Sequence, residues 1–206
     1  MEIVIPHHYR FDLTKNCLDS IPDTHRVYLV DDTIVGEAKH YCEYRKFVNW
    51  IHLKPCSLPY AINEGAKQVK GEWFLVSDND VIIDERTWRV ISETVTKAER
   101  VGASLCISQL KFVFWLVKTD VFRRLFYDEL FAPAGGEDED FHLRFCQAGY
   151  KWTQFDCLIY HQEMGHHSKG SIYDEGTQTE KFISKHGFRP HSDKYDKIVG
   201  SCYIHC

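Results

Sequence analysis

Gly-Glu-Trp-Phe-Leu-Val-Ser-Asp-Asn-Asp, residues 71–80, is a short apolar run that ends directly in two carboxylates. Gly71 marks the end of a helical pattern, and the apolar residues that follow it predict a buried strand. Asp78 and Asp80 come at once after that strand, with the turn-prone Asn79 between them. The stretch therefore predicts a strand that delivers two acidic side chains to one edge of a sheet.

Strand-like runs alternate with helical patterns on both sides of this stretch. The other predicted strands cover residues 2–6, 27–30, 47–53, 104–108, 112–117 and 155–160. The predicted helices cover residues 11–21, 37–45, 59–70, 85–101, 120–125, 137–147 and 177–186. This order predicts an α/β fold with a mostly parallel central sheet flanked by helices on both faces.

Length and charge limit the possible architectures and partners. With 206 residues, 44% of them apolar, residues 1–206 are predicted to form a single domain. A net charge of -5 with scattered Lys and Arg residues argues against nucleic acid as a partner. No transmembrane segment and no targeting signal is expected, which favours a cytoplasmic protein with reduced cysteines. The polar stretch from residue 161 onward predicts a C-terminal flap over the site, or an extension that wraps the core.

Two acidic pairs are predicted to face the same crevice. Asp31-Asp32 follows the strand at 27–30, as Asp78 and Asp80 follow theirs, and ligands of parallel sheets bind beyond the carboxyl ends of strands. Mn²⁺ or Mg²⁺ usually takes one or two protein carboxylates and completes its shell with phosphate oxygens and water. Asp-Asn-Asp also favours a turn unaided. Its place after a buried strand favours the metal site.

A second acidic cluster, Gly-Gly-Glu-Asp-Glu-Asp at residues 135–140, begins the predicted helix at 137–147. One interpretation is structural, because acids suit a helix N-terminus and Arg144 can pair with Asp140 one turn later. The other is catalytic, because a crowded carboxylate near an apolar wall has a raised pKa suited to a general base. We assign that role to Asp138, with Glu137 as the alternative.

Polar residues near position 161 offer further ligands. His161 ends a predicted strand and can complete the metal shell, with His166 and His167 as alternatives. Lys169, together with Ser168, is predicted to hold a leaving diphosphate.

In order along the chain, these segments resemble the GT-A fold glycosyltransferases, which are Rossmann-like, and especially their inverting family 2. The segments are Ile3-Val4-Ile5-Pro6 with Arg10, Leu29-Val30-Asp31-Asp32, Asn63-Glu64-Gly65-Ala66, residues 71–80, residues 135–140 with Arg144, His161, and residues 180–187. Residues 135–138 are also similar to the corresponding segment of galactosyl- and N-acetylgalactosaminyl-transferases. The chain further resembles the catalytic module of a longer, virus-encoded enzyme. Pro-His-His-Tyr at residues 6–9 and Thr-Ile-Val-Gly at residues 33–36 depart from the family pattern.

The resemblance implies a role for each matching residue. Asp80 would be a direct metal ligand, Asp78 would touch ribose or metal, and Asp138 would be the base. The residues expected to border the nucleotide are Pro6, His8, Arg10 and Asp32, and Asn63 is expected near the donor. Residues 1–100 would then form the nucleotide-sugar-binding half, and residues 101–206 the acceptor-side half.

The function expected from these features is metal-dependent, inverting transfer of a hexose from a nucleoside diphosphate sugar, with a UDP-sugar favoured, to a hydroxyl of a glycan or other acceptor. One alternative is a nucleotidyltransferase of sugar-nucleotide synthesis, although residues 6–12 lack the Gly-rich phosphate loop expected of that class. Another is a non-catalytic module that binds a sugar nucleotide or a glycan.

Overall fold

The computed structural model describes residues 1–162 and 175–205. Its strands are β1 (Glu2–His7), β2 (Arg26–Asp31), β3 (Val48–His52), β4 (Trp73–Ser77), β5 (Val81–Ile83), β6 (Leu105–Ser108), β7 (Lys111–Lys118), β8 (Trp152–Phe155) and β9 (Ile159–His161). Its helices are α1 (Phe11–Asp19), α2 (Lys39–Glu43), α3 (Leu58–Gln68), α4 (Glu85–Val101), α5 (Thr119–Leu125), the 3₁₀ turn η1 (Glu129–Phe131), α6 (Glu137–Gln147), α7 (Glu175–His186) and α8 (Asp193–Ser201).

The central sheet has seven strands in the order β3-β2-β1-β4-β7-β6-β8. The pairs β3·β2, β2·β1, β1·β4 and β6·β8 are parallel, and β7 runs antiparallel to both of its neighbours. The predicted α/β fold with a mostly parallel sheet in a single domain is confirmed. The parallel order also brings the carboxyl ends of β2, β1 and β4 to the same edge.

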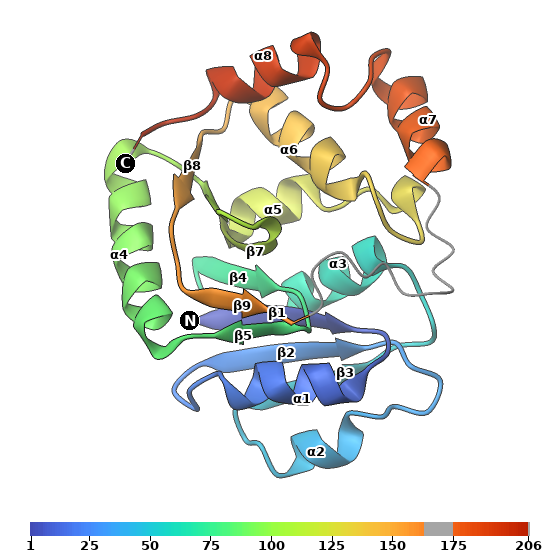
Figure 1. The fold of residues 1–206 in the computed structure, drawn as a ribbon, viewed down its shortest axis with the longest axis vertical. Coiled ribbons are helices and arrows are strands. Elements are labelled where there is room, and N and C mark those ends of the chain that lie inside the picture. The colour runs from blue at the N-terminus through green and yellow to red at the C-terminus, as the bar shows by residue number, and fades with distance from the viewer. Residues whose placement is uncertain (163–174, 206) are drawn as a thin grey trace.

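Alternate side chains of the strands build two cores, one on each face of the sheet, because successive residues of a strand point to opposite faces. Val4 of β1 belongs to the core that includes residues of α3, α5, α6, α7 and α8, whereas Ile3 and Ile5 belong to the core that includes residues of α1, α2 and α4. Figure 1 shows α6, α7 and α8 gathered at one end of the molecule. At Gly65 of α3 a Cβ atom would lie 2.5 Å from the Cγ1 of Val4, so only glycine allows this close approach to the sheet.

The structure differs from the sequence prediction at β5, at β8 and β9, and at α8. The strand predicted at 155–160 is two strands, β8 and β9, which belong to different sheets. β9 pairs with β5, a strand that the sequence did not predict. The helix α8 was also not predicted, although Ser192 caps its N-terminus by accepting a hydrogen bond from the backbone N–H of Tyr195.

Beyond residue 174, the chain packs against the rest of the protein. Phe182 of α7 is fully buried, and Tyr195 and Val199 of α8 are nearly so. Residues 175–205 therefore pack as an extension of the core, and a flap over the site stays a prediction. The cysteines of the described residues are free thiols, as predicted. No described helix is both long enough and apolar enough to cross a membrane.

Candidate active site

The acidic pairs of β2 and β4 lie on either side of the end of β1. In the sheet β1 pairs with both β2 and β4, and His7 at its end is aligned with Asp31. The backbone N–H of Asp78 still bonds the carbonyl of Val113 at 3.0 Å, so the chain leaves the sheet only after this residue. The predicted convergence of Asp31-Asp32 and residues 78–80 at one edge of the sheet is therefore what the topology produces.

Asp78, Asp80 and His161 form a cluster whose potential ligand atoms all lie within 4.8 Å of one another. The Nε2 atom of His161 lies 3.0 Å from Oδ1 of Asp80, and both side chains are 16% exposed. The antiparallel pairing of β5 with β9 aligns Val81 with His161 and so fixes this approach. Two carboxylates and one imidazole are a donor set suited to Mn²⁺ or Mg²⁺.

Electrostatics also fit a divalent cation at this cluster. Burial, together with the charges of Asp80 and Glu137, raises the pKa of Asp78 to about 8. In residues 1–162 and 175–205, no Lys or Arg forms an ion pair with Asp78, Asp80, Glu137 or Asp138. A cation bound here would offset the repulsion among these carboxylates.

Hydrogen bonds from Asn79 hold the turn between the two aspartates in place. The amide of Asn79 donates to the hydroxyl of Thr14 at 2.8 Å and to the carbonyl of Tyr9 at 3.4 Å. The Thr14 hydroxyl also lies 2.8 Å from Nδ1 of the buried His7. This chain of contacts ties the turn to α1 and to the end of β1, which fixes the position of the flanking carboxylates.

The N-terminus of α6 brings the second acidic cluster to the same site. Gly135 and Gly136 have φ values of 95° and 86°, and a Cβ atom on Gly136 would lie 2.9 Å from the ring of Phe131. Glu137 is 4% exposed, and its Oε2 has no hydrogen-bond partner in the described part of the chain. Burial raises the pKa of Glu137 to about 7.

Asp138 is half-buried and accepts a hydrogen bond on Oδ1 from the hydroxyl of Tyr127 at 2.5 Å. Burial and the charges of Glu137 and Glu139 raise the pKa of Asp138 well above its usual range, and the Tyr127 hydrogen bond acts in the opposite direction. Asp78 also contributes to this rise, so the carboxylates after β4 and at the start of α6 lie within electrostatic reach of each other.

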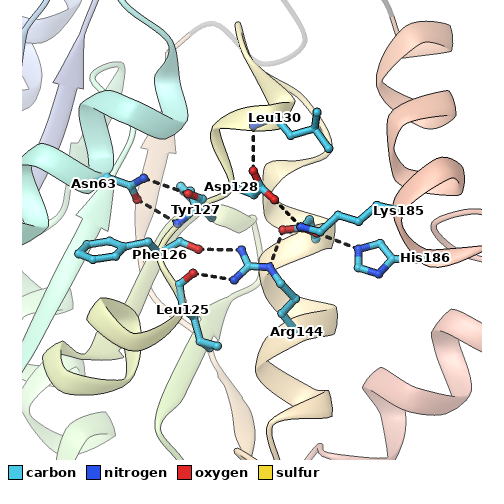
Figure 2. A network of polar contacts seen from close by, with 10 residues as sticks. Asn63, Leu125, Phe126, Tyr127, Asp128, Leu130, Arg144, Lys185 and His186 are labelled. Atoms are coloured by element: carbon cyan, nitrogen blue, oxygen red, sulfur yellow. Dashed lines mark hydrogen bonds and ion pairs between the residues drawn. The ribbon is translucent and has the colours of Figure 1, made fainter.

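Asp140, the last acid of the cluster, is bound by side chains of the protein itself. Asp140 is fully buried and accepts a hydrogen bond from Nε of Arg144 at 2.7 Å, which is the predicted pair one helical turn apart. The Nζ of Lys185 lies 2.5 Å from its other oxygen, and Nε2 of His186 lies 2.8 Å from that same oxygen. Figure 2 shows these side chains of α7 converging on α6. Asp140 therefore joins two helices, whereas Asp138 lies toward the site.

The residues predicted to border the nucleotide differ in their burial and in their contacts. Asp32 is buried, and its carboxylate lies 2.8 Å from Nδ1 of the exposed His8 and accepts from the backbone N–H of Cys56 at 3.1 Å. Pro6 is buried in β1. Arg10, the residue before α1, has a φ of 61° and forms an ion pair with Asp12 at 2.9 Å.

Asp31, the neighbour of Asp32, is bound within the protein. Its carboxylate accepts from the hydroxyl and N–H of Thr33 and from the indole of Trp50, so it holds the loop after β2. Asn63 is also buried, and its side-chain amide bonds the backbone of Tyr127. His166, His167, Ser168 and Lys169 lie outside the described residues.

Three contributors to the site had not been found from the sequence. Tyr127 belongs to no motif of the sequence, and only its contact with Asp138 shows that it contributes to the site. Gln162 bonds the carbonyl of Asp80 through both its backbone N–H and its side chain, at 2.9 and 3.1 Å. Thr14 lies on the buried side of α1 and acts through Asn79. A polar residue on the buried face of a helix, as at Thr14, was the one available signal.

Comparison with known proteins identifies the family of the chain. A family model described as glycosyl transferase family 2 matches residues 2–158. No curated protein sequence matches the chain significantly.

Solved structures share the fold at low sequence identity. S. aureus TarS 1-349 in complex with UDP-GlcNAc matches with a TM-score of 0.70 and 13% identity, over 97% of this chain and 70% of that one. The mannosyltransferase PcManGT from Pyrobaculum calidifontis, in complex with GDP-Man and Mn²⁺, matches with a TM-score of 0.68 and 11% identity, over 98% of this chain and 68% of that one. A further structure of TarS 1-349 matches with a TM-score of 0.53 and 12% identity, over 68% of this chain and 53% of that one, so this chain corresponds to only part of that protein.

Proposed function

Because this chain belongs to glycosyl transferase family 2, we propose that it moves a hexose from a nucleoside diphosphate sugar, with a UDP-sugar favoured, to a hydroxyl of a glycan or other acceptor. The reaction depends on Mn²⁺ or Mg²⁺ and inverts the anomeric centre. The observation that supports the proposal is that Asp78, which clusters with Asp80 and His161, lies within electrostatic reach of Glu137 and Asp138.

The metal end of the site binds the donor. Asp78, Asp80 and His161 would hold the cation, which neutralises the diphosphate as it leaves. Lys169 is proposed to contact the same diphosphate. His8, Asp32, Pro6 and Arg10 are proposed to border the base and ribose, and Asn63 to lie near the donor. The complexes of the two solved structures, one with UDP-GlcNAc and one with GDP-Man and Mn²⁺, support a nucleotide-sugar donor and a divalent ion.

The residues at the start of α6 are proposed to activate the acceptor. Asp138 takes the proton from the acceptor hydroxyl, and that oxygen attacks the anomeric carbon as its bond to the diphosphate breaks. A single displacement of this kind inverts the configuration. Glu137 is the alternative base, because it is buried and its Oε2 has no partner among the described residues. Residues 1–100 would thus form the donor half and residues 101–206 the acceptor half.

An assay of products distinguishes the three candidate functions. The protein is incubated with UDP-, GDP- and dTDP-sugars, with and without Mn²⁺, and free nucleoside diphosphate is measured. We expect metal-dependent release from at least one donor. A nucleotidyltransferase would instead release pyrophosphate from a nucleoside triphosphate and a sugar phosphate, and a binding module would release nothing.

A pair of variants assigns the activity to this site. We expect Asp80→Asn to abolish metal-dependent release. Asp84→Asn is the matched control, because Asp84 follows β5 and caps α4, where asparagine is an equally good cap. Equal activity of Asp80→Asn and the wild type would remove the proposal.

A further inference from the structure

We infer that Tyr127 is a positioning residue for the base: it orients the carboxylate of Asp138 and is itself held in place by Asn63 and Arg144. The inference rests on the proposed function, since it assumes that Asp138 accepts a proton. It assigns a task to a buried tyrosine that lies outside every motif of the sequence.

The contact itself is short and enclosed. The hydroxyl of Tyr127 lies 2.5 Å from Oδ1 of Asp138, and the tyrosine is 3% exposed. Its ring packs against those of Phe122 and Phe141, with centroids 5.7 and 5.4 Å away. The phenol therefore has one orientation, and its proton is directed at one oxygen of the carboxylate. Within residues 1–162 and 175–205 the other oxygen, Oδ2, accepts no hydrogen bond, which leaves it for the acceptor.

The backbone of Tyr127 is held by a side chain distant in sequence. The amide of Asn63 donates to the carbonyl of Tyr127 at 2.9 Å and accepts from its N–H at 2.9 Å. Figure 2 shows this paired contact between α3 and the segment before η1. Because both polar groups of one residue are satisfied by one buried side chain, Tyr127 can neither shift nor rotate without breaking two hydrogen bonds.

The preceding residues are held from the opposite side. Arg144 of α6 donates to the carbonyls of Leu125 and Phe126, each at 2.7 Å. Phe126 has a φ of 42°, a backbone conformation that residues other than glycine rarely adopt. The two hydrogen bonds from Arg144 therefore stabilise a strained turn. Because Arg144 and Asp138 share α6, the helix that carries the base also fixes the segment that orients it.

The charges around Asp138 give this contact a measurable consequence. The groups that face it are Tyr127 before η1, Asp78 after β4, Glu137 and Glu139 on α6, and Tyr195 on α8. The carboxylates favour the protonated, inactive form of Asp138. In the described part of the chain, Tyr127 is the hydrogen-bond donor to this carboxylate, and it favours the ionised, active form.

The test is the pH dependence of transfer by Tyr127→Phe. Without the hydroxyl, Asp138 stays protonated to a higher pH, so the acidic limb of kcat should move up by about one pH unit. At a pH on that limb, kcat should fall about tenfold, and it should recover toward the wild-type plateau as pH rises. The KM for the donor should change less than about twofold, because the donor site is untouched.

Tyr28→Phe is the matched control. Tyr28 is also buried and donates to a carboxylate, that of Glu2 at 2.7 Å, but at the opposite end of β1. Its pH profile should match that of the wild type. If Tyr127→Phe does not fold, 3-fluorotyrosine at position 127 is used instead. This more acidic phenol is a stronger donor, and it should move the acidic limb to lower pH.

The two possible failures are distinguishable. If the wild type transfers no sugar, the proposed function is wrong. If Asp138→Asn transfers normally, the role of base passes to Glu137 and the inference about Tyr127 is overturned. If the wild type transfers sugar and Asp138→Asn does not, but the pH profile with Tyr127→Phe or 3-fluorotyrosine matches that of the wild type, the role of Tyr127 is overturned while the function stands.

Discussion

Nε2 of His161 lies 3.0 Å from Oδ1 of Asp80, although the two residues are 81 positions apart. The pairing of β5 with β9 produces this approach, and Gln162 reinforces it by bonding the carbonyl of Asp80. A two-stranded sheet outside the central sheet thus joins the acidic turn after β4 to the end of β9. The proposed metal site depends on that small sheet as much as on the acidic turn.

The first prediction concerns the base. Asp138→Asn keeps the size of the side chain and removes its ability to accept a proton. We expect transfer to fall by about 10²-fold or more, the usual effect of losing a general base, while the donor still binds. Single-turnover transfer and calorimetric titration of the donor measure the two quantities separately. Unchanged transfer would shift the role to Glu137, for which Glu137→Gln is the corresponding test.

A second prediction concerns the pH dependence of stability. Burial raises the pKa of Glu137 from 4.5 to about 7, so between these values the folded chain retains a proton that the unfolded chain releases. Stability from this group therefore falls as pH rises from about 4.5 to about 7 and stays lowered above that. In metal-free protein, Glu137→Gln should be more stable than the wild type at pH 8, on the order of 2 kcal/mol, and equal to it near pH 4.

Urea denaturation across that pH range checks this second prediction. Glu85→Gln is the control, because Glu85 is likewise the first residue of its helix but is exposed. Parallel stability curves for wild type and Glu137→Gln would show that folding does not raise the pKa of this carboxyl.

A third prediction concerns the joint between α6 and α7. Asp140→Asn leaves the shape intact but removes the buried negative charge that Arg144, Lys185 and His186 share. Breaking a buried charge network in this way should lower the free energy of unfolding by about 3 kcal/mol or more. Asp120→Asn should lower it by less than about 0.5 kcal/mol, because its pair with Arg124 is exposed. Similar losses in the two variants would mean that the Asp140 network is not a stabilising joint.

How much could be predicted from sequence depends on whether the signal is local. The strand before the two acids was predicted at residues 73–76 and is confirmed as Trp73–Ser77, because a short apolar run bounded by glycine and a turn is a local pattern. The pairing of Asp140 with Arg144 was predicted for the same reason, since one helical turn separates them.

The contacts that sequence reasoning missed are long-range. β5 and β9 have three residues each, too short for a periodic pattern, and their pairing joins residues 76 to 80 positions apart. Tyr127 contacts Asp138 through a turn held by Asn63, 64 positions away, and no spacing rule connects them. Local patterns therefore identified the acids of the site, whereas the side chains that hold these acids in place were found only in the tertiary structure.

The central claim is that Asp78, Asp80 and His161 hold one divalent cation for the donor diphosphate. The most direct measurement is titration of the protein with Mn²⁺ in the presence of UDP, followed by electron paramagnetic resonance of the free ion. The wild type and Asp84→Asn should each take up one ion per chain. Asp80→Asn should bind at least about tenfold more weakly, since even outer-shell partners of a metal are typically worth that much. An unchanged single site in Asp80→Asn would contradict the account.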